Sequence, residues 1–107
     1  MIVLTGARIF DGETFREDHV LVIEGERIAA IVPCAEEPRG PVRDLGGGLL
    51  APGFIDVQVN GGGDVLFNDA PSPEGIATIV AAHRRFGTTA LLPTLISDTA
   101  EKMRAAD

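Results

Sequence analysis

The chain has 107 residues, of which 45 % are hydrophobic, and a formal net charge of −7. This length fits one small domain, and the hydrophobic share is normal for a folded protein and too high for a disordered one. The negative charge argues against binding nucleic acid or an anionic membrane through a broad basic face.

The first half of the chain predicts short strands separated by turns. We expect strands at residues 2–4, 7–10, 19–23, 27–32 and 42–45. Glu24-Gly25 predicts the two-residue loop of a hairpin, with glycine supplying the positive φ, and Pro33 ends the returning strand. Cys34 is the sole cysteine, which excludes an intrachain disulfide, and we interpret it as an incidental surface or edge residue. No helical period is present, so residues 1–51 predict a small β module.

A glycine-rich stretch closes this half. Gly46-Gly-Gly-Leu-Leu-Ala51 formally matches the glycine pattern of a dinucleotide-binding loop. Such a loop needs a helix directly after it, whose N-terminus meets the pyrophosphate. Pro52-Gly53 forbids that helix. We therefore predict a turn and no dinucleotide site.

The second half, residues 52–107, changes to a strand–helix–strand pattern. Residues 54–59 and 88–96 predict strands, and Ser72 and Pro73 predict the cap and first position of a helix that Gly87 ends. The apolar face expected for this helix comprises Ile76, Ile79, Val80, His83 and Phe86. Asp98-Thr-Ala-Glu101 has the spacing of a capping box, so a second helix is expected to begin there. Two parallel strands normally belong to a larger sheet, and the chain is therefore expected to be truncated.

Two amide side chains mark the end of the strand at 54–59. Gln58 and Asn60 are two residues apart, so both point to the same side of a regular strand. The loops after parallel strands form the active site in barrels of such strands. Gly61, Gly62 and Gly63 let the chain turn sharply or approach a ligand closely. Spacing alone leaves a binding site and a solvated strand end equally open.

These residues carry a resemblance to a known family. A β module that leads through Leu-Ala-Pro-Gly-Phe-Ile-Asp-Val (residues 50–57) into a polar pair resembles the amidohydrolase superfamily. Most members have His-x-His where this chain has Gln58-Val-Asn60. The Gln-x-Asn-Gly-Gly variant, with Gly87-Thr-Thr and Leu-Pro-Thr-Leu-Ile (residues 92–96), looks more like the N-acetylglucosamine-6-phosphate deacetylases.

The resemblance implies an α/β fold. Residues 1–51 would form an incomplete β-sandwich module, and residues 52–107 the first βαβ unit of a (β/α)8 TIM barrel. A carboxamide is a poor Zn²⁺ ligand beside imidazole or carboxylate, so Gln-x-Asn implies one divalent metal ion in the full-length protein instead of two. Gln58, Asn60 and Gly61 to Gly63 would line the active site without binding metal. The metal-binding and catalytic residues of the family match no position of this chain, which is expected to hold no metal alone.

The same resemblance implies a function. The full-length protein would hydrolyse the acetamide of N-acetylglucosamine 6-phosphate in amino-sugar catabolism, and this chain alone would be inactive. A phosphorylated amino-sugar substrate, a homodimer and a cytoplasmic location are implied, with no nucleic-acid or membrane partner. No apolar run approaches the ~18 residues of a membrane span, and no signal pattern opens the chain. The alternatives are another amidohydrolase acting on cyclic amides and a non-catalytic β-rich binding module.

The remaining polar residues have simpler interpretations. His83 is expected to be a partly buried, hydrogen-bonded histidine and not a ligand. Asn68 and Asp69 are interpreted as turn formers. Arg84 and Arg85 end a helix, where positive charge complements the dipole. His19 has no partner of metal-binding type nearby in sequence. Asp56 shares a face with Gln58 and is expected either to form a hydrogen bond within the barrel floor or to support the site. Asp64 stands where the family usually has another glycine, and would be strained if the position needs positive φ.

Overall fold

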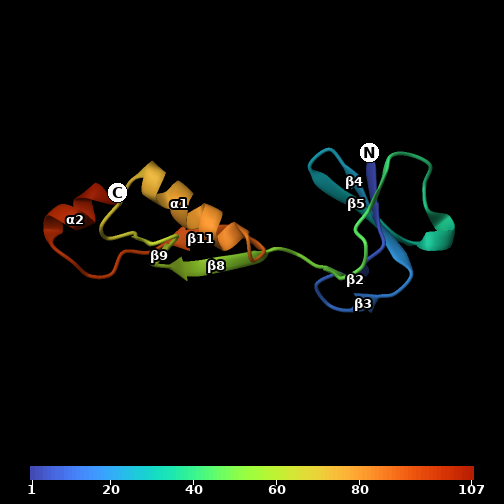
Figure 1. Cartoon of the computed structure of the whole chain (residues 1–107), viewed down its shortest axis with the longest axis horizontal. Coiled ribbons are helices and arrows are strands. Elements are labelled where there is room, and N and C mark those ends of the chain that lie inside the picture. Colours follow the sequence, from blue (N-terminus) through green and yellow to red (C-terminus); the bar gives the residue numbers. More distant parts are fainter. The chain divides into compact units, whose positions relative to one another are not determined.

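The computed structural model describes residues 1–107, which divide into two compact units, Met1–Pro52 and Gly53–Asp107 (Figure 1). None of the helices has the length and apolar character needed to cross a membrane.

The unit Met1–Pro52 consists of short strands arranged in two small sheets. Its elements are β1 (Ile2–Thr5), β2 (Arg8–Phe10), β3 (Phe15–Arg16), β4 (His19–Glu24), β5 (Arg27–Pro33), the 3-10 turn η1 (Cys34–Glu36), β6 (Val42–Asp44) and β7 (Leu49–Leu50). One sheet has the order β5-β4-β1-β6 and the other has the order β3-β2-β7. Val3 on β1 and Val20 on β4 are fully buried, and Ile9 is buried on β2. The predicted β-rich character of this half is confirmed.

The hairpin between β4 and β5 is displaced by one residue from its predicted position. Glu24 pairs with Arg27, so the loop residues are Gly25 and Glu26, and the prediction of Glu24-Gly25 was wrong. Gly25, the first loop residue, has a φ of +59°, whereas Glu26 has no positive φ; positive φ at the first position alone is the pattern of a type II′ turn, which favours glycine there. The role predicted for the glycine is confirmed, although its place in the loop is different.

The glycine-rich stretch before Pro52 ends in a strand that the sequence did not predict. Gly46, Gly47 and Gly48 all have positive φ, and β7 then pairs parallel to β2. A strand and not a helix follows the glycines, so the prediction that Pro52-Gly53 excludes a helix there is confirmed. Cys34 is exposed, as predicted.

The unit Gly53–Asp107 contains the predicted strand, helix and strand, with a hairpin inserted after the first strand. Its elements are β8 (Phe54–Val59), β9 (Gly61–Gly62), β10 (Val65–Leu66), α1 (Pro73–Arg84), β11 (Thr88–Pro93) and α2 (Ala100–Ala105). The strands β8 and β11 pair in parallel, and β9 and β10 pair antiparallel. The helix α1 lies along the β8–β11 pair (Figure 1). Val59, Phe67 and Ile79 form the buried core between them.

The start of α1 is as predicted, whereas its apolar face is narrower. Ser72 Oγ accepts a hydrogen bond of 3.1 Å from the Gly75 amide, and Pro73 is the first helical residue. Only Ile79 of the predicted apolar face is fully buried, while Val80 is 38 % and Phe86 is 76 % exposed. Phe86 falls outside the face because the helix ends at Arg84 and tightens into a turn, in which the Phe86 amide bonds the His83 carbonyl.

Two predicted boundaries near the end of the chain were wrong. The strand β11 ends at Pro93 and not at residue 96, because β8 provides no backbone partner beyond Val59. The cap of α2 is Thr99 and not Asp98: Thr99 Oγ1 accepts from the Lys102 amide at 3.3 Å. The Asp98 carboxylate binds the side chain of Asn68 instead, which removes it from the capping position.

Candidate functional site

Asn60 lies directly after β8 and is held by the residue that directly follows β11. Its Nδ2 donates to the Thr94 carbonyl oxygen and to Thr94 Oγ1, both at 2.9 Å. The backbone joins the same two strand ends, because the Thr94 amide donates to the Val59 carbonyl at 2.8 Å. Asn60 and Thr94 therefore form a fixed polar pair at the C-terminal ends of two parallel strands.

The hydrogen bonds of this pair determine what it offers to a ligand. Both contacts use the Nδ2 group of Asn60, so its Oδ1 remains as an acceptor. Thr94 Oγ1 accepts from Asn60, which leaves the threonine hydroxyl hydrogen free to donate elsewhere. One acceptor and one donor side by side match the donor and acceptor of an amide group.

Gln58 does not join this pair. Its side chain is exposed, and its backbone amide donates to Asp56 Oδ1 at 3.0 Å. Asp56 thus bonds the backbone of its own strand, and its predicted role in the barrel floor or in support of the site stays a prediction. Thr94, by contrast, was not predicted as a site residue. Its position after an apolar strand, equivalent to that of Asn60 after β8, was the signal that could have found it.

The three glycines after Asn60 are explained by a tight hairpin packed on α1. A Cβ atom on Gly61 would lie 2.4 Å from the Val65 carbonyl oxygen, and one on Gly62 would lie 2.9 Å from His83 Nε2. Gly63 and Asp64 form the two-residue turn, with φ of +61° and +62°. Close packing accounts for these glycines, and their contact with a ligand stays a prediction.

His83 positions this hairpin. Its Nε2 lies 2.9 Å from the Gly61 carbonyl oxygen, which only accepts, so the Nε2–H form of the ring donates this bond. The prediction of a partly buried, hydrogen-bonded histidine is confirmed. Arg84 lies in the last turn of α1, where its positive charge complements the helix dipole as predicted, and Arg85 caps that turn with its guanidinium over the Phe86 ring.

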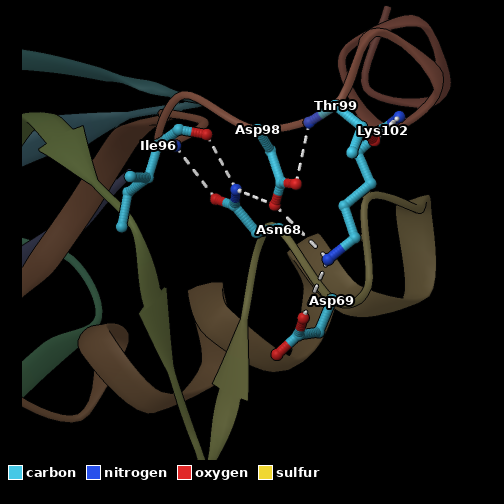
Figure 2. A network of polar contacts seen from close by, with 6 residues as sticks. All are labelled: Asn68, Asp69, Ile96, Asp98, Thr99 and Lys102. Atoms are coloured by element: carbon cyan, nitrogen blue, oxygen red, sulfur yellow. Dashed lines mark hydrogen bonds and ion pairs between the residues drawn. The ribbon is translucent and has the colours of Figure 1, made fainter.

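Asn68 lies in a turn, as predicted, but its side chain is also a buried structural group, which was not predicted. It is 4 % exposed, and its side chain bonds both the amide and the carbonyl of Ile96 (Figure 2). The Asp98 carboxylate accepts from Asn68 Nδ2 and from the Thr99 amide, and Lys102 lies 3.3 Å from Asp98 and 3.4 Å from Asp69. Asp69 lies in the same turn, since its amide donates to the Leu66 carbonyl, and its interpretation as a turn former is confirmed.

The residues of this chain do not fit a metal site. No three His, Cys, Asp or Glu side chains gather where they could hold an ion. Of the polar pair at β8, Asn60 is bound to Thr94, and carboxamide oxygens are weak ligands for Zn²⁺.

Comparisons with known proteins identify the family. Residues 1–50 match the family model described as the NagA composite domain. The chain is 40 % identical over 90 residues to the N-acetylglucosamine-6-phosphate deacetylase of Haemophilus influenzae, covering 83 % of this chain and 24 % of that protein. The crystal structure of the N-acetylglucosamine-6-phosphate deacetylase from Pasteurella multocida matches 98 % of this chain and 28 % of its own, with a TM-score of 0.91 and 34 % identity. By sequence and structure, the chain is a relative of the N-acetylglucosamine-6-phosphate deacetylases.

Another relative of the chain is named for a different substrate. The N-acetylgalactosamine-6-phosphate deacetylase of a Shewanella species is 55 % identical over 62 residues, covering 58 % of this chain and 16 % of that protein. The chain spans about a quarter or less of the length of the curated deacetylases it matches.

Asp64, the second residue of the turn between β9 and β10, provides a direct test of the hairpin. Its φ of +62° confirms that the position needs the left-handed region. We expect Asp64→Gly to leave stability within about 1 kcal/mol of the parent, because glycine removes the strain but loses more entropy on folding. We expect Asp64→Val to cost at least about 1–2 kcal/mol, because a β-branched side chain is poorly tolerated at positive φ. Urea unfolding of both variants measures this, and equal stability of the two would contradict the turn geometry.

The Asp98 network predicts a pH dependence. The hydrogen bond from Asn68, followed by those from the Thr99 amide and Lys102, holds the pKa of Asp98 below its ordinary value of 3.8. A lowered pKa means that the ionised carboxylate stabilises the fold above pH 3.8, and that this stabilisation is lost as the pH falls through the lowered pKa. The Thr99 amide chemical shift, followed by NMR, should titrate with a midpoint below 3.8. Asp98→Asn should abolish that titration, whereas a midpoint at or above 3.8 would contradict the network.

Proposed function

We propose that the chain is the N-terminal part of a metal-dependent deacetylase that hydrolyses the acetamide of N-acetylglucosamine 6-phosphate to glucosamine 6-phosphate and acetate. The observation that carries the proposal is the Asn60–Thr94 pair at the ends of β8 and β11, in a chain whose fold matches a deacetylase at a TM-score of 0.91. In this proposal Met1–Pro52 is part of a β-sandwich, and Gly53–Asp107 begins a (β/α)8 barrel.

The exposure of the β8–β11 pair supports the barrel. Phe54, Ile55 and Val57 of β8 are 67 %, 71 % and 68 % exposed, and Leu92 of β11 is 58 % exposed. Adjacent positions on a strand point to opposite faces, so apolar side chains are exposed on both faces of β8. Parallel strands are buried on both faces in α/β proteins, which fits further strands and helices packing here in a full-length protein.

The polar pair is proposed to orient the substrate. Asn60 Oδ1 would accept the N–H of the substrate acetamide, and the Thr94 hydroxyl would donate to an oxygen of the sugar or acetyl group. Gln58, exposed at the same strand end, would add a further hydrogen bond. These contacts would hold the amide in a reactive orientation without taking part in proton transfer.

The metal ion of the proposal would be held by residues outside Met1–Asp107, because this chain provides no ligand set. A divalent ion, when bound, polarises the amide carbonyl and lowers the pKa of a water molecule. We propose that a single ion is present, that the full-length protein is a cytoplasmic homodimer, and that the 107-residue chain alone is inactive.

A second candidate substrate is N-acetylgalactosamine 6-phosphate. It is favoured by the 55 % identity over 62 residues to a protein named for that activity. The two sugars differ only in the configuration at C4, so the choice between them depends on contacts at that carbon. Asn60 and Thr94, which are proposed to contact the acetamide, would serve either substrate.

The test is acetate release by a protein expressed from the full-length coding sequence, in a host that lacks its own deacetylase. We expect release from N-acetylglucosamine 6-phosphate, with little from the unphosphorylated sugar. A higher kcat/KM for N-acetylgalactosamine 6-phosphate would favour the second candidate. No release from either phosphorylated sugar would overturn the deacetylase proposal, and cleavage of a cyclic amide instead would assign the protein to another amidohydrolase activity.

A further inference from the structure

The backbone beyond β11 is paired by side chains in place of a strand. The last backbone hydrogen bond between the β8 and β11 segments joins the Thr94 amide to the Val59 carbonyl. Beyond Val59 the chain enters the β9–β10 hairpin and no longer runs beside the segment that follows β11. Two residues beyond Thr94, the Ile96 amide donates to Asn68 Oδ1 at 2.9 Å, and the Ile96 carbonyl accepts from Asn68 Nδ2 at 2.7 Å. A carboxamide carries the same donor and acceptor as a peptide group. Asn68 therefore takes the place of the missing strand.

The burial of Asn68 makes this contact specific. Its side chain is nearly inaccessible at 4 % exposure, so water cannot replace it without rearrangement of the segment. In addition to its two bonds to Ile96, Asn68 donates from Nδ2 to Asp98 Oδ2 at 3.0 Å, which holds the C-terminal end of the same segment (Figure 2). Residues 94–98 are thus held at three points, by Asn60 at Thr94 and by Asn68 at Ile96 and Asp98.

We propose that Asn68 is a positioning residue, whose carboxamide fixes residues 94–98 so that Thr94 is presented beside Asn60. This inference rests on the proposed function, because it assigns Asn68 an effect on the reaction through Thr94. Asn68 does not itself contact substrate, since its side chain is buried and its polar atoms are bonded to Ile96 and Asp98.

The first test measures the segment directly in the full-length protein. In Asn68→Ala, amide hydrogen exchange at Ile96 is expected to be at least about tenfold faster, because its acceptor is lost. Exchange at the buried core residue Ile79 should change far less. The matched control is Asp69→Asn, which alters the neighbouring residue, whose side chain is 70 % exposed, and should leave exchange at Ile96 unchanged. Unchanged exchange at Ile96 in Asn68→Ala, or an equal increase at Ile79, would overturn the positioning role.

The second test measures coupling to Thr94 in the reaction. Asn68→Ala is expected to lower kcat/KM for the phosphorylated amino sugar by about tenfold to a hundredfold, since a small misplacement of a contact has effects of this size. If Asn68 acts through Thr94, adding Thr94→Ala to Asn68→Ala should lower kcat/KM by no more than about threefold further, and by much less than Thr94→Ala does alone. Independent, additive effects would overturn the proposal. A parent protein that releases no acetate would instead refute the proposed function, and the exchange measurement would then decide whether Asn68 positions the segment.

Discussion

Replacement of Ile79 by alanine is expected to destabilise the unit Gly53–Asp107 by about 2–5 kcal/mol. Ile79 is fully buried on α1 and packs against Val59 and Phe67 in the core of this unit. Truncation removes apolar contacts with both and leaves a cavity between the helix and β8. The free energy of unfolding, from urea titration followed by far-UV circular dichroism, measures the effect.

The neighbouring Val80 provides the matched control. It lies on the same helix but is 38 % exposed, so Val80→Ala should cost less than about 1 kcal/mol. Equal losses in the two variants would show that α1 does not pack on β8 through Ile79.

Replacement of Gly61 by alanine is the second change with a large expected effect, about 1–3 kcal/mol. Gly61 has no positive φ, so the effect is steric: the new Cβ atom would lie 2.4 Å from the Val65 carbonyl oxygen of the paired strand. That oxygen belongs to the backbone and cannot move without opening the β9–β10 hairpin. Loss of the hairpin would also displace the carbonyl that His83 binds.

Gly40→Ala is the control for this substitution. Its φ is ordinary as well, and its new Cβ atom would meet only the flexible end of the Met1 side chain. We expect it to leave stability within about 0.5 kcal/mol. If Gly61→Ala were as mild, close packing would not explain the glycine, and a role in ligand approach would become the better explanation.

Elements that depend on local sequence were predicted well. The cap at Ser72, the proline at the helix start and the strand at Phe54–Val59 follow from residues adjacent in the chain. The strand-to-helix alternation also predicted the parallel pairing of β8 and β11. Local signals therefore sufficed for the order and type of the main elements.

Features that depend on distant residues were missed or misread. The buried contacts of the Asn68 side chain were missed because its partners, Ile96 and Asp98, lie about thirty residues further along the chain. The same contact moved the cap of α2 from Asp98 to Thr99. Gly62 has a similar explanation, since the side chain that requires the glycine is His83 on α1. No local pattern contains this information.

The candidate site was predicted in part. Asn60 lies at the end of β8 with a fixed hydrogen-bonding role, whereas Gln58 is exposed and Thr94 was not foreseen. The lining of an active site by Gln58, Asn60 and the three glycines stays a prediction until a substrate complex is examined.

The most direct measurement is a titration of metal-free full-length protein with Zn²⁺ while acetate release from N-acetylglucosamine 6-phosphate is followed. A pair of carboxamides in place of two imidazoles predicts that activity rises in proportion to added metal and levels off at about one equivalent per polypeptide. A plateau at about two equivalents would mean that the carboxamides do not replace a metal position. No acetate release at any ratio would contradict the deacetylase function itself.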